Sequence, residues 1–172
     1  GIWMAYANTI FYTVFGTLVS LALTICGAYS LSKKRLVGVS TINFIIALTM
    51  WINMSGPAGM IPFYLNLRDM HLLDSRFGII IAFAVTTFNV FLLRTFFATI
   101  PDTLEEAAKV DGAGDWTILW RIYLPLSLPA IVTVGLFYAV QRWNGYFWAM
   151  VLLRDESKMP LQVLLKKLIV EL

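Results

Sequence analysis

Long apolar stretches separated by short polar segments dominate this chain. No charged residue occurs from Gly1 to Ser32 or from Leu36 to Leu67, and Lys33-Lys34-Arg35 separates these two stretches. A helix needs roughly 20 consecutive apolar residues to cross the hydrocarbon core of a bilayer. The pattern therefore predicts an all-α protein, a polytopic bundle of transmembrane helices.

The apolar pattern predicts four spans, over approximately residues 9–31, 39–55, 77–97 and 125–150. The charge-free stretch 36–67 would be about 48 Å long as one straight helix, which is too long for one crossing. Gly56-Pro57 and Gly59 are therefore predicted to break it. Residues 161–172 form an amphipathic stretch after the last span.

Composition supports an integral membrane protein. Hydrophobic residues make up 59% of the chain, charged residues 13%, and the mean hydropathy is +0.77. A soluble domain carries about twice that charged fraction. The lone Cys26 lies in an apolar run, so we interpret it as a small core residue without a disulfide or metal partner.

Charge is unevenly distributed along the chain. Residues 101–123 carry five acidic and two basic side chains, a net charge of −3 in a protein whose total is +3. Such an acidic loop suits a basic protein surface better than anionic lipid headgroups. Two predicted spans separate it from Lys33–Arg35, so both segments are expected on the same side of the membrane. The basic cluster favours the cytoplasmic side, although this bias is weak because the opposite side carries Arg68, Arg76, Arg154 and Lys158. Residues 66–76 and 154–160 are then expected outside.

The acidic loop is predicted to contain two short helices joined by a glycine bend. Residues 103–106 form a capping-box pattern that predicts a helix over 104–110. Gly112 is expected to end this helix in a left-handed conformation. Asp115 is expected to cap a second helix over 116–123, and Leu124-Pro125 to turn the chain into the last span.

The stretch 106–125 reads EAAKVDGAGDWTILWRIYLP. Its spacing resembles the cytoplasmic coupling loop in the membrane subunits of bacterial ATP-driven (ABC) importers. In those subunits the loop transmits mechanical work from a partner ATPase. The resemblance assigns ATPase coupling to Glu106, Ala107, Ala108, Asp111, Gly112, Ile122, Leu124 and Pro125.

The whole chain resembles the permease subunits of carbohydrate-uptake ABC importers, the group that includes the smaller permease of the maltose transporter. The resemblance extends to Asn8-Thr9, Gly27-Ala28-Tyr29, Ile61–Tyr64, Trp143-Asn144 and Pro160-Leu161-Gln162. Such permeases usually have six spans, so residues 1–172 look like a partial transmembrane domain with the coupling loop at 101–125.

The resemblance also implies the partners and the location. It implies a second permease subunit, two cytoplasmic ATPase subunits and an extracytoplasmic solute-binding protein, in the bacterial inner membrane, with no nucleic acid. No cofactor is expected in this chain, because it has no GxxxxGK[ST] phosphate-binding motif. ATP and magnesium would be bound by the partner ATPases, so this subunit is expected to be non-catalytic.

Polar and aromatic residues in or near the spans are candidates for a sugar path, because sugars stack on aromatic rings and hydrogen-bond to amides. These candidates are Asn53, Asn89, Tyr138, Gln141, Trp143 and Asn144, together with Asn43, Arg142 and Phe147. The alternative is that the aromatic residues form an interfacial belt and the amides, Asn43 included, bond neighbouring helices. Arg94 is expected to extend toward the lipid headgroups.

Three other functions remain open at this level. An importer for an amino acid, a phosphonate or a polyamine would share the same coupling loop. A channel or secondary carrier would need charged residues buried in its spans, and the sequence offers only Arg94 near such a position. An intramembrane enzyme would need a catalytic dyad in the spans, and none is visible.

Overall fold

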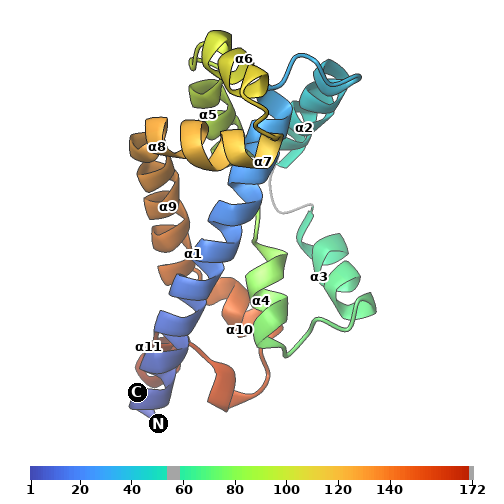
Figure 1. The fold of residues 1–172 in the computed structure, drawn as a ribbon. Helices are drawn as coiled ribbons and strands as arrows, with labels where there is room; N and C mark the ends of the chain where they lie inside the picture. The colour runs from blue at the N-terminus through green and yellow to red at the C-terminus, as the bar shows by residue number, and fades with distance from the viewer. Residues whose placement is uncertain (54–58, 171–172) are drawn as a thin grey trace. The chain divides into compact units, whose positions relative to one another are not determined.

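The computed structural model describes residues 1–53 and 59–170, and all the regular secondary structure in these ranges is helical (Figure 1). The α-helices are α1 (Ile2–Ser32), α2 (Val39–Asn53), α3 (Met60–Asp69), α4 (Arg76–Ala82), α5 (Thr87–Phe97), α6 (Asp102–Val110), α7 (Asp115–Ile118), α8 (Leu124–Leu126), α9 (Leu128–Trp143), α10 (Tyr146–Leu152) and α11 (Leu161–Val170). A π-helical turn, η2 (Leu119–Tyr123), and a 3-10 turn, η3 (Glu156–Lys158), complete them.

Helix α1 is long and apolar enough to cross a membrane alone. Two bent pairs in the described residues meet the same criterion when each pair is taken together: α4 with α5, and residues 115–126 with α9. Helix α2 is apolar but shorter. The all-α prediction is confirmed. The expected break at Gly56-Pro57 lies outside the described residues, as does the end of the predicted span at Ser55.

The predicted span over 77–97 is not one continuous helix, although α4 and α5 taken together meet the criterion for a span. Helix α4 ends at Ala82, and Thr86 has an extended backbone before α5 begins. The β-branched run Val85-Thr86-Thr87 disfavours helix at this point, because two heavy atoms on Cβ restrict the side chain against the preceding turn.

The predicted last span over 125–150 is also interrupted. Helix α9 ends at Trp143, and α10 starts at Tyr146 after Asn144 and Gly145. A glycine inside a helix costs about 1 kcal/mol relative to alanine, so this pair is a natural place for the helix to stop. Polar side chains at residues 141–145 therefore lie at a helix end rather than inside a continuous span.

The described residues form two compact units. Unit 1 contains residues 1–20, 59–84 and 136–170. Its apolar core includes Tyr12, Ile80, Ala149, Leu153, Met159 and Val163. The beginning of α1 is tied to the segment before α11, because Asn8 Nδ2 donates to the Ser157 carbonyl (2.7 Å) and Thr9 Oγ1 accepts from the Leu161 N–H (2.8 Å).

A surface loop of unit 1 is organised by Asp74, which has a left-handed backbone (φ 54°). Its carboxylate accepts hydrogen bonds from the backbone N–H groups of Arg154 and Asp155, both at 3.0 Å. These two bonds lower the pKa of Asp74 below its ordinary value. The carboxylate therefore stays ionised and holds the turn at residues 154–158.

Unit 2 contains residues 21–53 and 85–135, and here α2, α5, α6 and α7 surround the end of α1 (Figure 1). The backbone carbonyl of Leu31, in the last turn of α1, accepts hydrogen bonds from Arg94 Nε (3.1 Å) and from Asn43 Nδ2 (3.3 Å). The prediction that Arg94 extends toward lipid headgroups is thus corrected, since the guanidinium caps the end of α1. Asn43 makes the interhelical bond that the alternative reading expected.

One face of α1 carries small residues at every fourth position: Gly16, Ser20, Thr24 and Ala28. The last three are fully buried. Small residues let helix backbones approach closely, which is the usual way for helices to pack within a membrane. Cys26 lies off this face and is exposed, so the prediction of a core cysteine is wrong.

Candidate coupling site and pocket

The acidic loop folds as two helices joined by a tight bend. Helix α6 ends at Val110, and Gly112 has the positive φ (83°) that a left-handed helix cap requires. The Gly112 N–H donates to the Lys109 carbonyl (3.0 Å) and the Ala113 N–H to the Ala108 carbonyl (2.9 Å). This pair of bonds is the Schellman arrangement. The expected bend at Gly112 is confirmed.

Neither predicted side-chain cap forms. Helix α6 starts at Asp102, two residues before the expected start, and its N-cap residue Pro101 makes no side-chain bond. Gly114, not Asp115, precedes α7. The Asp115 carboxylate instead accepts from the Arg35 guanidinium at 2.5 Å. Both partners of this bond are charged, whereas in an N-cap only the carboxylate would be charged.

The chain turns into α9 at Ser127 and not at Leu124-Pro125. Residues 115–126 are helical throughout and meet α9 at an angle of 85°. Proline is tolerated here because it occupies the first turn of α8. The wider π-helical turn η2 directly precedes it, and such turns commonly absorb an irregularity within a helix.

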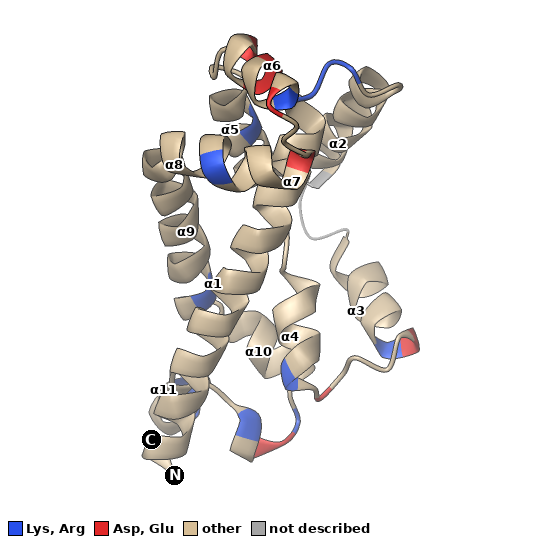
Figure 2. Ribbon diagram, viewed as in Figure 1, with Lys and Arg blue, Asp and Glu red and all other residues tan. Residues whose placement is uncertain are grey.

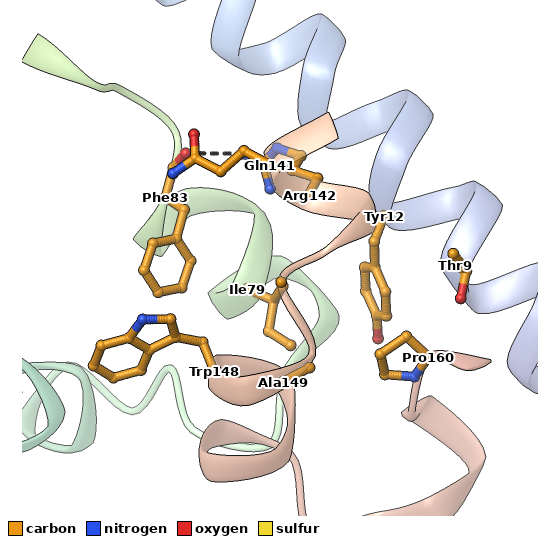
Figure 3. A pocket seen from close by; sticks show the side chains of 10 residues that line it. Thr9, Tyr12, Ile79, Phe83, Gln141, Arg142, Trp148, Ala149 and Pro160 are labelled. Carbon is orange, nitrogen blue, oxygen red and sulfur yellow. Dashed lines mark hydrogen bonds between the residues drawn. The ribbon is translucent and has the colours of Figure 1, made fainter. Parts of the chain in front are cut away.

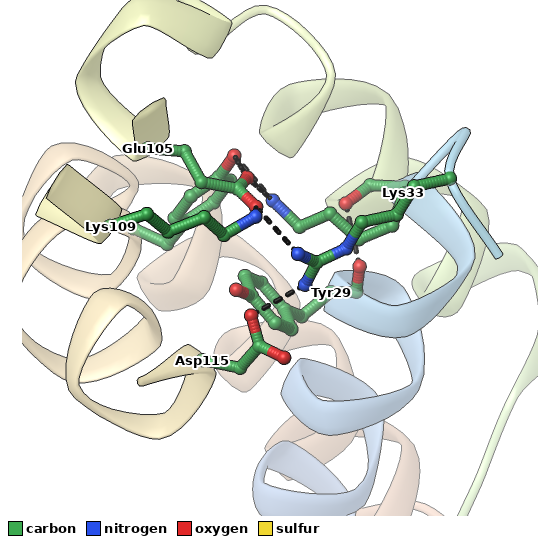
Figure 4. A network of polar contacts seen from close by, with 8 residues as sticks. Tyr29, Lys33, Glu105, Lys109 and Asp115 are labelled. Carbon is green, nitrogen blue, oxygen red and sulfur yellow. Dashed lines mark hydrogen bonds and ion pairs between the residues drawn. The ribbon is translucent and has the colours of Figure 1, made fainter. Parts of the chain in front are cut away.

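A buried ionic network attaches α6 to the end of α1 (Figure 4). The side chain of Glu105 is 9% exposed and pairs with Lys33, whose side chain is 8% exposed. Lys109 Nζ lies 2.6 Å from the other Glu105 oxygen. The Tyr123 hydroxyl accepts from Lys33 (2.6 Å) and donates to Glu105 (3.1 Å).

Aromatic rings surround this network. Lys33 Nζ lies 4.3 Å from the centroid of the Tyr29 ring and 4.0 Å from that of Tyr123. The Tyr123 ring also meets Phe97 edge to face at 5.5 Å. A cation over an aromatic face gains electrostatic energy while water is excluded. The Tyr29 and Tyr123 rings therefore flank the ammonium group of Lys33.

The network shifts the pKa values of Glu105 and Tyr123. Burial alone would raise the pKa of Glu105, but hydrogen bonds from Lys109 and Lys33 outweigh it and lower the pKa to about 2. Burial, together with the neighbouring Glu105 carboxylate, raises the pKa of Tyr123. At neutral pH, Glu105 is thus ionised and Tyr123 keeps the proton that it donates.

The coupling candidates lie mostly on the outer surface of this loop. Glu106, Ala107, Asp111, Gly112 and Pro125 are exposed, whereas Ala108, Ile122 and Leu124 are partly buried. Figure 2 shows the acidic residues of α6 and of the start of α7 in red, near the blue basic segment that follows α1. The exposed part of the loop is therefore free to contact another protein, while Glu105 is not.

The sugar-path candidates divide between the two units. Tyr138, Gln141, Trp143 and Asn144 belong to unit 1, and Asn89 belongs to unit 2. Tyr138 and Asn89 are buried, as expected for polar groups facing a helix bundle. Trp143 and Asn144 are exposed. The side chain of Asn53 lies outside the described part of the chain.

Unit 1 contains a cavity of about 90 Å³ (Figure 3). Of the sequence candidates for the sugar path, Gln141 and Arg142 line it and Tyr138, Trp143 and Asn144 do not. Its wall also includes Phe83, Trp148, Tyr12 and Thr9. A single water molecule needs about 10–15 Å³ of such space, so the cavity has room for several waters or one ring-sized polar group.

Comparison with known proteins decides the family. Residues 1–168 match the model of the family described as binding-protein-dependent transport system inner membrane component. The chain belongs to this family. As a member of a family of ABC transporter permeases, this permease chain is associated with a membrane.

Solved and curated relatives agree. A bacterial ABC transporter involved in the import of the acidic polysaccharide alginate has a chain with a TM-score of 0.93 and 58% identity, covering 99% of this permease chain and 60% of its own. The Bacillus subtilis polygalacturonan/rhamnogalacturonan transport system permease protein YtcP is 43% identical over 98% of this chain and 58% of its own. The B. subtilis arabinooligosaccharides transport system permease protein AraQ is 26% identical over 95% of this chain. The permease chain thus spans about 58–60% of the first relatives that it matches.

Sequence reasoning missed three residues that the permease structure brings together at the loop: Lys33, Glu105 and Tyr123. The Glu105–Lys109 pair at i,i+4 was a readable signal for a helix-surface ion pair. A second signal was the prediction that the basic segment and the acidic loop lie on the same side of the membrane. Neither signal shows that Glu105, and not Glu106, points inward.

The bend at Gly112 yields a direct prediction. A side chain at this position would meet no atom within 4 Å, so any cost comes from the backbone conformation. Gly112→Val should cost about 1–2 kcal/mol and reduce transport, because a β-branched residue is strained at positive φ. Gly112→Asn should be milder, because Asn tolerates this region. Uptake by the full importer with each variant measures this, and equal, full uptake by both would contradict it.

Proposed function

We propose that this chain is a permease subunit of an ATP-driven, binding-protein-dependent importer and forms half of the translocation path for an oligosaccharide. The observation that carries the proposal is the folded loop 101–125, in which Glu106, Ala107 and Gly112 are exposed and an internal ion pair holds the loop in place. The polysaccharide and oligosaccharide transporters among its relatives support a sugar as the substrate.

The proposal includes partners and location. A second permease would complete the path, two ATPase subunits would bind ATP and magnesium and receive the coupling loops, and a solute-binding protein would deliver the sugar. The chain would pass several times through the bacterial cytoplasmic membrane. It would itself hydrolyse no ATP, and its sequence has no phosphate-binding GxxxxGK[ST] motif.

A secondary carrier is a weaker explanation. Proton-coupled carriers use titratable groups within the membrane. The charged side chains on helices α1, α2, α4, α5 and α9 are Arg76, Arg94 and Arg142, and arginine does not release its proton in proteins. A ligand can drive the path between its outward-open and inward-open states only if it binds one state more tightly than the other. ATP bound to the partner subunits would be that ligand.

Transport in proteoliposomes tests the proposal. The full importer is reconstituted with ATP on the ATPase side and the solute-binding protein with sugar on the other. Sugar should accumulate with ATP, and accumulation should stop when the partner ATPase is inactivated, even under an imposed proton or sodium gradient. Gradient-driven accumulation without ATP would instead establish a secondary carrier and reject the proposal.

A further inference from the structure

Arg142 occupies an unusual position in unit 1, at the end of α9 and on the wall of the cavity (Figure 3). Its Nη2 donates to Ser20 Oγ (2.9 Å) and to the carbonyls of Ile80 and Phe83 (3.0 and 3.1 Å). The two carbonyls belong to the end of α4, where the helix breaks. Arg142 thus supplies donors that the broken helix lacks.

These three acceptors are neutral, so they do not compensate the charge of the guanidinium. No carboxylate lies within 4 Å of Arg142 among residues 1–53 and 59–170, whereas several other basic residues have acidic partners there. Arg142 Nε is buried and has no hydrogen-bond partner in that same part of the chain. A partly buried cation without a counter-charge is costly, and arginine cannot relieve the cost by losing its proton.

Two features hold the guanidinium in place beside the cavity. A Cβ built on Gly16 would lie 2.5 Å from Arg142 Cζ, so the guanidinium rests against the bare backbone of α1. Nη2 shares its two hydrogens among these three acceptors, which fixes the orientation of the guanidinium. Nε is enclosed by the protein, so Nη1 is the nitrogen that the held guanidinium can offer to a carboxylate from a defined position.

The rest of the cavity wall has the chemistry of a sugar site. Phe83 and Trp148 pack with ring centroids 5.4 Å apart, and Phe63 supports Trp148 from 5.1 Å. Gln141 adds an exposed amide next to Arg142. An aromatic face, an amide and a cation within one cavity match a ring that is apolar on its face, hydroxylated at its edge and negatively charged at one position.

We propose that this cavity binds one uronate unit of an acidic oligosaccharide, with its carboxylate on the Arg142 guanidinium and its ring against Trp148 and Phe83. The inference rests on the proposed function, because it assigns a substrate class and a specificity-determining residue to the same translocation path. The anion compensates the charge of the guanidinium. Neutral sugars gain the aromatic contact but leave Arg142 without a counter-charge.

Equilibrium binding to the full importer in lipid nanodiscs, without the solute-binding protein, tests this. The two probes are a short oligouronate and the same oligosaccharide with its carboxyl groups reduced to alcohols. Wild type should bind the oligouronate at least about tenfold more tightly, as a charge-assisted pair implies. Arg142→Gln should abolish this preference by weakening the binding of the oligouronate far more than that of the reduced sugar, and Arg142→Lys should retain part of the preference.

Arg154→Gln is the matched control, since Arg154 is exposed and lies outside the cavity, and it should keep the wild-type preference. Equal weakening of both probes in Arg142→Gln would show a purely structural role for Arg142. A preserved preference in that variant, or no binding by wild type, would also overturn the proposal. ATP-driven uptake of the oligouronate is measured separately, so the proposed import function can stand even if this site fails.

Discussion

Replacing Glu105 with glutamine is expected to detach the coupling loop and lower uptake by about tenfold or more. Removing one partner of a buried ion pair costs about 3–5 kcal/mol, because the other charge remains buried without compensation. Here the stranded charge is Lys33, whose side chain is 8% exposed. Limited proteolysis near Gly112 and sugar uptake, measured on the same importer preparation, report the loss.

Glu106→Gln is the matched control for this prediction, because it makes the same chemical change on the adjacent, exposed residue. It should leave the resistance of the loop to proteolysis at the wild-type level. If Glu105→Gln were equally resistant, the buried pair would not be what holds the loop against α1.

The same carboxylate makes a pH-dependent contribution. The pKa of Glu105 is lowered to about 2 from an ordinary value of 4.5. Its stabilisation is therefore fully present above about pH 4.5 and is lost as the pH falls toward 2. Within that window Glu105→Gln should flatten the pH dependence of loop stability, and a wild-type slope in the variant would contradict the assignment.

Reversing the charge of Glu106 is expected to abolish uptake without preventing membrane insertion. The carboxylate is exposed on α6 at a motif position, and Glu105 beside it is already neutralised within the chain. A lysine at position 106 would place like charges together at a basic partner surface, which costs several kcal/mol. The measurements are sugar uptake and copurification of the ATPase with the permease.

Glu156→Lys is the control for this charge reversal. Glu156 is highly exposed, and its turn is expected on the opposite side of the membrane. The change in net charge is the same, but uptake should remain near wild type. Wild-type uptake by Glu106→Lys would show that the loop does not dock through this residue.

The features predicted from sequence were those that depend on single residues or on local spacing. Gly112 was predicted because a left-handed cap selects glycine wherever the helix ends, and its φ of 83° agrees. The helices themselves follow from apolar composition. The caps were not predicted correctly. The Asp115 carboxylate could accept either from a nearby backbone N–H or from a residue distant in sequence, and sequence spacing does not show that Arg35 lies 2.5 Å away.

Features that depend on tertiary contacts could not be predicted from the sequence. Apolar composition alone does not distinguish a continuous helix from two helices separated by a break. In this chain the carbonyl groups of Ile80 and Phe83 at the break accept hydrogen bonds from Arg142, a contact that composition does not reveal. The same limit applies to Glu105 and Glu106, which are adjacent and chemically identical. Only the position of Lys33 decides which of them is buried.

Photo-cross-linking from the loop tests the central claim, that this chain receives work from an ATPase through residues 101–125. A photoreactive amino acid is placed at Ala107, which is exposed on α6, or at Ser157 in the turn after α10, within the full importer in its native membrane. We expect a covalent adduct with the ATPase subunit from position 107 and none from position 157. No ATPase adduct from position 107, or one from position 157 alone, would contradict the account.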